Sequence, residues 1–310
     1  MRCLVTGGAG FIGSNLVDAL LARGDEVTVV DNLSTGRRVN LEPALAAGAE
    51  LVELDIRDGE ALSRLATEKR PERIFHLAAQ IDVRKSLADP FFDAGVNVGG
   101  TANVLEAARA SECARVVSIS TGGAIYGEGE GQQLPLPEDA PIAPLSAYGQ
   151  SKFAAEGYLS LFERLYGLSG VSLRLGNVYG PRQDPLGEAG VIAIFCGLLK
   201  EGGRPRVFGD GTQTRDYIYV GDVVSAALAA GESDATGAIN IGTGVETNVL
   251  ELIEALKGLS GNESFEPEFA PARTGEVQRI TIDAGRAERE LGWRAEMGLD
   301  DGLRVTLESI

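Results

Sequence analysis

The sequence predicts an α/β fold built on a doubly wound parallel sheet. Short, almost wholly apolar runs alternate with stretches of helical length through the first half of the chain, which is typical of a parallel sheet covered by helices on both faces. A glycine-rich turn follows the first run, as in Rossmann-type sheets. Beyond about Gly176, glycine, proline and charged residues interrupt the alternation. This change predicts a smaller C-terminal α/β lobe that faces the substrate.

The predicted elements follow one another along the chain. The strands are Cys3–Thr6, Val27–Asp31, Leu51–Leu54, Arg73–Leu77, Val116–Ser120 and Val171–Leu175. The helices are Ile12–Ala22, Glu60–Lys69, Asn97–Ala110, Ser151–Tyr166, Val191–Lys200, Asp222–Ala230 and Val249–Lys257. We expect residues 1–176 to form the dinucleotide-binding domain, with a strand near residues 238–242 returning to its sheet. Residues 177–310 are expected to form mainly the substrate lobe.

Composition excludes several classes of protein. The 310 residues carry a formal net charge of −17, and such a surface repels nucleic acid and anionic membranes. No apolar run is long enough to span a membrane and no secretory signal precedes the first strand, so we expect a cytoplasmic protein. The three cysteines lack metal-ligand spacing and are expected to be buried apolar residues, with no metal site. The only histidine, His76, is expected to be structural.

The turn after the first strand predicts a dinucleotide site. It reads Thr6-Gly7-Gly8-Ala9-Gly10-Phe11-Ile12-Gly13 and joins a strand to a helix, which is the context that a glycine fingerprint requires. The spacing of Gly7, Gly10 and Gly13 allows a tight turn and brings the backbone close to a pyrophosphate at the positive end of the helix. Phe11 and Ile12 are included in the predicted cofactor site.

The end of the second strand indicates which dinucleotide binds. Asp31 follows Gly13 by 18 residues, and an acidic residue at that point binds the ribose 2′-hydroxyl of NAD and repels the 2′-phosphate of NADP. Arg37 and Arg38 could favour NADP, but Asp31 holds the contact position itself, so we predict NAD. Asn32 and Leu33 are included in the site.

Two further strand ends complete the predicted cofactor site. Asp55 and Ile56 follow the third strand and are expected to flank the adenine. Leu77, Ala78 and Ala79 follow the fourth, where small residues let a cofactor lie close to the sheet edge.

Tyr148 and Lys152 are the predicted chemical centre. Residues four apart on a helix project from the same face, and an ammonium near a phenol stabilises the phenolate and lowers the tyrosine pKa. A tyrosine tuned in this way exchanges protons with a substrate hydroxyl near neutral pH.

Longer motifs accompany this pair and extend over nearly the whole chain. They include the runs from His76 to Gln80, from Ser120 to Gly127, from Arg174 to Arg182, from Phe208 to Gly211, from Arg215 to Tyr217, from Asn240 to Gly242 and from Glu290 to Trp293, together with the Val83-Arg84-x-Ser86 pattern. With them the chain resembles the extended short-chain dehydrogenase/reductase family, and within it the UDP-hexose 4-epimerases.

The resemblance implies an NAD-dependent 4-epimerisation of a UDP-hexose through a transient 4-keto sugar, with NAD retained between turnovers. It makes Tyr148 the base on the sugar 4-hydroxyl and gives Lys152 two roles, lowering the tyrosine pKa and binding the nicotinamide ribose. A cofactor that carries the difficult step while the protein orients it is a common arrangement.

The third catalytic group departs from the family pattern. Many members carry a catalytic serine four residues before the equivalent of Tyr126, where this chain has Gly122. Thr121 or Ser120 is therefore expected to serve, with Thr121 preferred. Related 4,6-dehydratases place Asp-Glu after a catalytic threonine to eliminate water. Gly122 and Gly123 stand there instead, which argues against dehydration.

The resemblance also implies a nucleotide-sugar site. Arg215 and Arg273 are expected to clamp the diphosphate, since a guanidinium donates paired hydrogen bonds to phosphate. Asn177 is expected to contact the sugar or diphosphate, and Val207 and Phe208 to pack near the uracil.

Three alternatives stay open from the sequence. Arg84, from a pattern shared with UDP-glucuronate 4-epimerases, could hold a carboxylate at carbon 6, which suits UDP-glucuronate epimerisation or decarboxylation. Ile280 stands where some epimerases carry a pocket-narrowing tyrosine, which could admit an N-acetylhexosamine. A non-catalytic NAD-sensing protein is disfavoured because such proteins lose the Tyr/Lys pair. By resemblance the chain forms a homodimer through the helices at 97–110 and 151–166.

Overall fold

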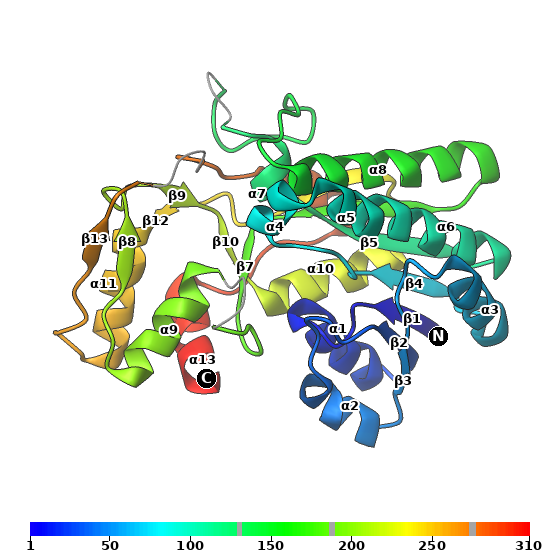
Figure 1. Cartoon of the computed structure of the whole chain (residues 1–310), viewed down its shortest axis with the longest axis horizontal. Helices are drawn as coiled ribbons and strands as arrows, with labels where there is room; N and C mark the ends of the chain where they lie inside the picture. Colours follow the sequence, from blue (N-terminus) through cyan, green and yellow to red (C-terminus); the bar gives the residue numbers. More distant parts are fainter. Residues whose placement is uncertain (129–131, 186–189, 273–276) are drawn as a thin grey trace.

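Seven parallel strands form the central sheet of this computed structural model, which describes residues 1–128, 132–185, 190–272 and 277–310 (Figure 1). The spatial order is β11-β6-β5-β4-β1-β2-β3, and every adjacent pair is parallel. The doubly wound sheet is therefore confirmed. The strands are β1 (Arg2–Thr6), β2 (Glu26–Asp31), β3 (Glu50–Glu53), β4 (Arg73–His76), β5 (Arg115–Thr121), β6 (Gly170–Leu175) and β11 (Gly237–Ile241).

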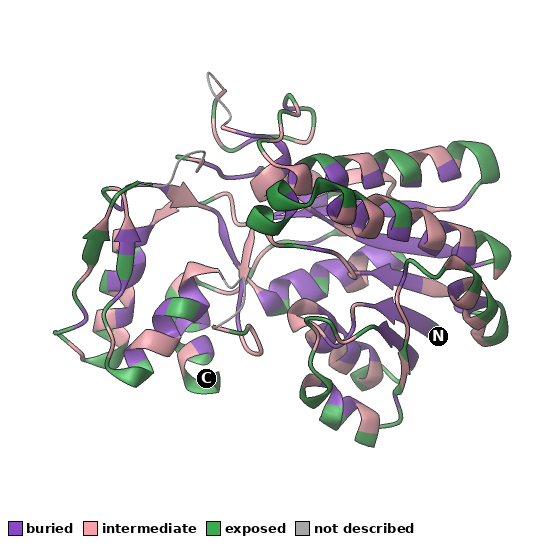
Figure 2. Cartoon of the chain, in the orientation of Figure 1, coloured by how far each residue is buried: buried purple, intermediate pink, exposed green. Residues whose placement is uncertain are grey.

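Both faces of the sheet are covered, which explains the continuous apolar runs (Figure 2). Side chains alternate between faces along a strand, so Leu4 and Val5 belong to different apolar clusters. On one face the strands pack with α1 (Phe11–Ala22), α2 (Glu42–Ala46), α10 (Val220–Glu232) and α12 (Gly285–Leu291). On the other they pack with α3 (Gly59–Lys69), α6 (Gly100–Ala110) and α8 (Ala147–Tyr166).

A separate apolar core lies in the smaller lobe, at the left of Figure 1. Its helices are α9 (Val191–Glu201), α11 (Val249–Ser260) and α13 (Leu299–Ser309). Three two-stranded sheets accompany them: β7 (Asn177–Tyr179) with β10 (Tyr217–Tyr219), β8 (Arg206–Phe208) with β13 (Glu268–Ala270), and β9 (Thr214–Arg215) with β12 (Thr247–Asn248).

The second half of the chain is divided between the two cores. Helix α10 packs on the sheet against α1, because its buried face is small and apolar, with Ala226, Ala227 and Ala230 in the sheet-side cluster. Strand β11 pairs with β6, which confirms the predicted return of a strand near 238–242.

Several short helices are missing from the sequence prediction. The 3₁₀ turn η1 (Arg38–Leu41) follows β2, whereas α4 (Val83–Ala88), α5 (Pro90–Ala94) and α7 (Gly122–Ile125) lie in the catalytic region. The π-helical turn η2 (Gly95–Gly99) overlaps the start of the helix predicted at Asn97. Helix α8 begins at Ala147, four residues before the predicted start, because the Ser146 side chain accepts a hydrogen bond from the Gly149 N–H. The longer helix includes Tyr148 in its first turn.

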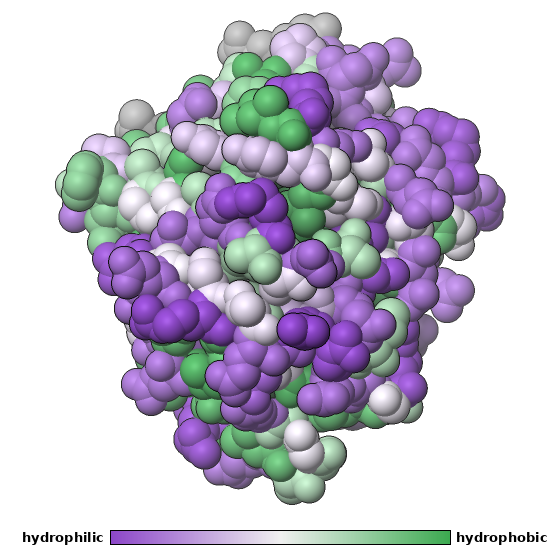
Figure 3. Space-filling view, turned by 90° about the vertical axis from the view of Figure 1, so that its right-hand side faces the viewer, coloured by the Kyte–Doolittle hydropathy of each residue, from purple (hydrophilic) through white to green (hydrophobic). Residues whose placement is uncertain are grey.

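The polar composition is visible on the surface. Hydrophilic residues cover much of the face in Figure 3, and apolar residues form small separate patches. The three cysteines are free and buried, as predicted. Within the described ranges, no helix is both long and apolar enough to cross a membrane.

Candidate active site

The glycine turn between β1 and α1 leaves no room for side chains. Gly7 has a φ of +71°, and a Cβ there would lie 2.6 Å from the Ala78 nitrogen. A Cβ at Gly13 would lie 2.2 Å from the Gly7 carbonyl oxygen. The first position needs glycine for its backbone conformation and the second for close packing. The turn therefore holds the start of α1 tightly against the end of the sheet.

The first turn of α1 presents free donors. Its N-cap is Gly10, which makes no side-chain capping hydrogen bond, and the first turn carries no acidic residue. The first N–H groups of a helix lack partners within it and carry partial positive charge. A glycine cradle with uncapped donors fits a dinucleotide pyrophosphate.

Asp31 lies beside this cradle at the end of β2. Its carboxylate accepts hydrogen bonds of 2.9 Å from the backbone N–H groups of Ala9 and Leu33. Burial raises the pKa of Asp31, and the two donors offset part of that effect. The backbone therefore orients the acid that is expected to meet the adenosine ribose.

Asn32 and Asp55 connect the ends of β2 and β3. The Asn32 amide donates to Asp55 at 2.9 Å, and Arg57 donates two side-chain hydrogen bonds to the same carboxylate. These contacts hold the pKa of Asp55 well below its usual range, with the Arg57 hydrogen bonds as the largest cause. Ile56 is buried and packs against Gly100. A Cβ at Gly100 would lie 2.5 Å from the Cδ1 atom of Ile56.

The end of β4 is fixed by a buried hydrogen-bonded chain. The Thr6 hydroxyl lies 2.7 Å from His76 Nδ1, and Thr101 lies 2.9 Å from Nε2. Burial lowers the pKa of His76 to about 3, so the ring is neutral at physiological pH. Ala78 N–H donates to the Thr6 hydroxyl at 3.3 Å. The structural assignment of His76 agrees with this geometry, and Leu77, Ala78 and Ala79 follow it directly against the glycine turn.

Tyr148 and Lys152 both lie in the first two turns of α8, and Lys152 is buried. The Tyr148 phenol makes a hydrogen bond with the Thr121 side chain. The backbone N–H of Tyr148 donates to the Ser86 hydroxyl at 3.1 Å, and Ser86 is fully buried. Ser86, which the sequence analysis placed only in a motif, thus anchors the first turn of α8.

The pKa of Tyr148 runs against the expectation from sequence. Although the side chain keeps some exposed surface, burial is the largest influence and raises its pKa to about 12, with the Thr121 hydrogen bond acting in the opposite direction. Burial lowers the pKa of Lys152 to about 8. Burial is thus the largest influence on the pKa of Tyr148 in this structure, and the predicted influence of Lys152 on that pKa stays a prediction.

Ser120 and Thr121 occupy different surroundings although they are adjacent. Thr121 meets Tyr148, whereas the Ser120 hydroxyl is buried and donates to Glu156 at 2.5 Å. Glu156 also forms a buried ion pair with Arg174 at 2.8 Å. Because successive strand residues point to opposite faces, only one hydroxyl can reach the tyrosine.

The residues expected to bind the nucleotide sugar are less closely grouped. Asn177 lies on β7, and a Cβ at Gly123 would be 3.4 Å from its side-chain oxygen, so it faces the segment after Thr121. Phe208 is partly buried on β8, and Arg84 is exposed on α4. Arg273 lies outside the described residues.

Val207 lies in the apolar core of the lobe, with its side chain 1% exposed. The adjacent Phe208 is partly exposed on the same strand. That this pair packs near the uracil stays a prediction.

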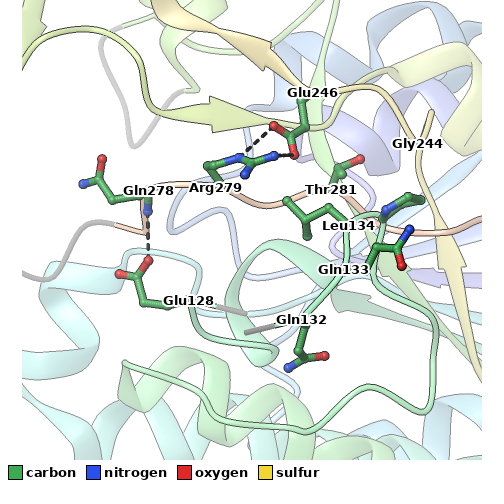
Figure 4. Close-up of a pocket in the computed structure, with 10 residues that line it drawn as sticks. Glu128, Gln132, Gln133, Leu134, Gly244, Glu246, Gln278, Arg279 and Thr281 are labelled. Carbon is green, nitrogen blue, oxygen red and sulfur yellow. Dashed lines mark hydrogen bonds and ion pairs between the residues drawn. The ribbon is translucent and has the colours of Figure 1, made fainter. Parts of the chain in front are cut away.

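Arg215 and its neighbour Thr214 lie on opposite faces of β9. Thr214 donates to Glu246 at 3.2 Å, and Arg279 donates to the same carboxylate at 2.7 Å. Glu246 and Arg279 line a pocket of about 670 Å³ (Figure 4). Arg215 itself is partly buried, and its Nη1 donates to the Thr214 carbonyl at 2.8 Å.

Asp216 joins the segments around the site and was named in the sequence only as part of a motif. Its buried carboxylate accepts hydrogen bonds from the backbone and hydroxyl of Thr243, from Gly244 N–H and from the Thr281 hydroxyl. An acid with this many donors ties β9, β11 and the segment after residue 277 together. The donors to the Asp216 carboxylate come from segments that lie far apart in the sequence.

Together these features define a dinucleotide-dependent enzyme of the extended short-chain dehydrogenase/reductase type. The chain belongs to the NAD dependent epimerase/dehydratase family, whose pattern it matches over residues 3–242. Membership confirms the resemblance expected from the motifs and the dependence on NAD. Within the described residues, no group of histidine, cysteine or acidic side chains could hold a metal ion.

Relatives match the chain over almost its full length. A UDP-glucose 4-epimerase of Mycolicibacterium smegmatis is 48% identical over 310 residues, which is 99% of this chain and 98% of that protein. The structure of UDP-glucose 4-epimerase from Thermotoga maritima with UDP-glucose has a TM-score of 0.95 at 44% identity, covering 100% of this chain and 98% of the other. The UDP-glucose 4-epimerase of Thermus thermophilus in complex with NAD gives 0.91 at 44% identity, with the same coverage.

Proposed function

We propose that this protein catalyses the NAD-dependent interconversion of UDP-glucose and UDP-galactose. The observation that carries the proposal is the meeting of Thr121 with Tyr148 at the end of β5, on the helix that also bears Lys152. Full-length similarity to UDP-glucose 4-epimerases, at 48% identity in one case, supports the same reaction.

In this mechanism Tyr148 removes the proton from the sugar 4-hydroxyl as carbon 4 becomes a ketone. Thr121 bridges the phenol and the substrate oxygen. Lys152, buried one helical turn after Tyr148 on α8, provides positive charge that favours the phenolate. A bound NAD would supply the hydride acceptor and donor for carbon 4, and Tyr148 would return its proton to the oxygen at carbon 4.

We assign the cofactor and the nucleotide sugar to different halves of the chain. The cofactor is assigned to residues 1–176, with Gly7, Gly10, Gly13 and Asp31 as its central contacts. The nucleotide sugar is assigned mainly to residues 177–310. Asn177 supports this division because it lies on the first strand after the boundary and faces the catalytic segment.

The decisive experiment compares UDP-glucose, UDP-glucuronate and UDP-N-acetylglucosamine side by side with the purified protein. We expect epimerisation of UDP-glucose, and abolition of it in Tyr148→Phe with NAD content unchanged. Epimer formation from the uronate or the acetamido sugar alone would replace the proposed substrate. Full activity of Tyr148→Phe would overturn the mechanism.

We also infer a homodimer formed through α8 and the helices around α6. Tyr158 and Leu165 on α8 are 40% and 60% exposed, and Phe91 on α5 is 89% exposed. Ala154, Tyr158 and Leu165 recur at helical spacing on one side of α8, which gives an apolar stripe. Exposed apolar stripes of this kind mark protein interfaces.

The dimer is tested by analytical ultracentrifugation. Tyr158→Glu should convert a species of twice the chain mass to a monomer, because a charge in the centre of an apolar interface is left unpaired. Tyr166→Glu at the C-terminal end of the same helix is the matched control and should weaken association less. A monomeric wild type would contradict the inference.

A further inference from the structure

Asp93 is a fully buried carboxylate beside the catalytic helix. Its exposure is 0%, and it lies on α5 immediately before the π-helical turn η2. Oδ1 accepts hydrogen bonds from the side chains of Gln80 at 2.8 Å and Asn97 at 3.2 Å. Oδ2 is buried with no hydrogen-bond partner. A buried acid without a cation is costly, so a structural purpose alone would be served better by an amide or an apolar residue.

A hydrogen-bonded chain connects Asp93 to the turn between Tyr148 and Lys152. Asn97, which donates to Asp93, also donates to the Ser151 hydroxyl at 3.0 Å. The Ser151 hydroxyl in turn donates to the Tyr148 carbonyl at 3.0 Å. Gln80 and Asn97 are locked together by two further bonds, at 2.8 and 2.9 Å. The carboxylate is therefore fixed relative to the helical turn that carries Tyr148 and Lys152.

The charges around the pair can be named element by element. Strand β4 contributes neutral His76, and α8 contributes Glu156, which Arg174 of β6 already pairs. Helix α4 places Lys85 4.6 Å from the Phe92 ring, on the outer side of α5. The Asp82 carboxylate is occupied in capping α4. Of these acids in the described part of the chain, Asp93 is the one whose carboxylate keeps an oxygen without a hydrogen-bond partner.

We propose that Asp93 is a positioning residue for the reaction, holding the Tyr148 turn through Asn97 and Ser151 and supplying the buried negative charge opposite the Tyr148 and Lys152 side chains. This inference rests on the proposed roles of those two residues. A negative charge favours protonated lysine and disfavours the phenolate. In agreement, Asp93 acts to raise the pKa of both Tyr148 and Lys152.

The test is the pH profile of kcat for the holoenzyme carrying Asp93→Asn. Asparagine keeps an acceptor for Gln80 and Asn97 and removes the charge. We expect both limbs of the profile to move to lower pH together, by on the order of one unit. Asp89→Asn is the control, because Asp89 is an exposed cap of the same helix and asparagine also caps helices. It should leave the profile in place.

An unmoved profile in Asp93→Asn, with or without a lower kcat, would overturn the proposal, and so would an equal shift in Asp89→Asn. Should Asp93→Asn not fold, Asp93→Ser is judged by the same criteria, since it leaves space for water to satisfy the neighbouring amides. Activity in Tyr148→Phe would instead overturn the proposed mechanism, so the two failures are distinguishable.

Discussion

The Ser120 hydroxyl donates a 2.5 Å hydrogen bond to Glu156, four residues beyond Lys152 on the same helix. Glu156 also accepts three contacts from the Arg174 guanidinium, at 2.8 to 3.3 Å. Ser120 is thereby committed to a buried network that joins β5, α8 and β6. Its neighbour Thr121 remains at the tyrosine, so the two adjacent hydroxyls serve different purposes.

Substituting each hydroxyl separately should distinguish these purposes. Thr121→Ala should lower kcat about 100-fold, since it removes a group that assists proton transfer, while Thr121→Ser should restore most of the activity. Ser120→Ala should leave kcat within a few-fold and lower the free energy of unfolding by about 1 kcal/mol. Steady-state kinetics and urea denaturation measure both. The opposite pattern would make Ser120 the catalytic hydroxyl.

The Glu156–Arg174 pair should be important for stability because it is buried. Both residues are less than 10% exposed, and Glu156→Gln leaves the guanidinium without its counter-charge. We expect a loss of about 3 kcal/mol in the free energy of unfolding. Glu106→Gln breaks the surface pair with Arg109 and should cost less than about 1 kcal/mol. Equal losses in the two variants would refute the distinction.

Asp31 should determine the choice between NAD and NADP. Asp31→Asn keeps an acceptor for the backbone donors and removes the charge that repels a 2′-phosphate. We expect NAD affinity to fall about 10-fold and the preference over NADP to shrink, as measured by reconstituting the apoprotein with each cofactor. Glu53→Gln is the matched control, because Glu53 lies opposite Asp31 in the β2–β3 register and is exposed. A similar change in both variants would show that the cofactor preference depends on the overall negative charge of this strand end and not on Asp31 itself.

The neutral His76 predicts a specific loss of stability in mild acid. Its pKa is about 3 in the folded protein against an ordinary 6.5, so below pH 6.5 the unfolded chain binds the proton first. Stability from this group is complete above pH 6.5 and falls toward pH 3, by about 2 kcal/mol between pH 6.5 and 5. Urea denaturation at those two pH values measures it. His76→Gln should show a difference smaller by that amount, and an unchanged difference would contradict the prediction.

The central sheet could be predicted from the sequence because its strands are buried on both faces. Strands covered on both faces are continuously apolar, and the glycine turn marks where the first of them enters a helix. The start of α8 was missed although Ser146 is a suitable N-cap residue, since a cap is recognised only when the helix is extended back to it.

The contacts within the candidate site could not be predicted from the sequence, because they join segments that lie far apart in the chain. The Asp93, Asn97 and Ser151 chain spans 58 residues of sequence from Asp93 to Ser151 and leaves no periodic pattern. The burial of Val207 in the lobe core was not predicted, because an apolar residue on a short strand can face either side. The desolvation that raises the pKa of Tyr148 was not predicted, because burial of a side chain depends on the packing of distant segments.

The seventh strand has a consequence for synthesis on the ribosome. Strand β11, residues 237–241, completes the edge of the sheet beside β6, and α10, which covers the sheet next to α1, ends only at Glu232. A nascent chain that has emerged through residue 176 therefore holds the whole glycine cradle and the Tyr148 helix but presents an unpaired β6 edge and an uncovered apolar face. Such edges recruit other chains. Early release or truncation at that point should yield an aggregation-prone fragment, and the cofactor half reaches its own folded state only after much of the substrate lobe has been made.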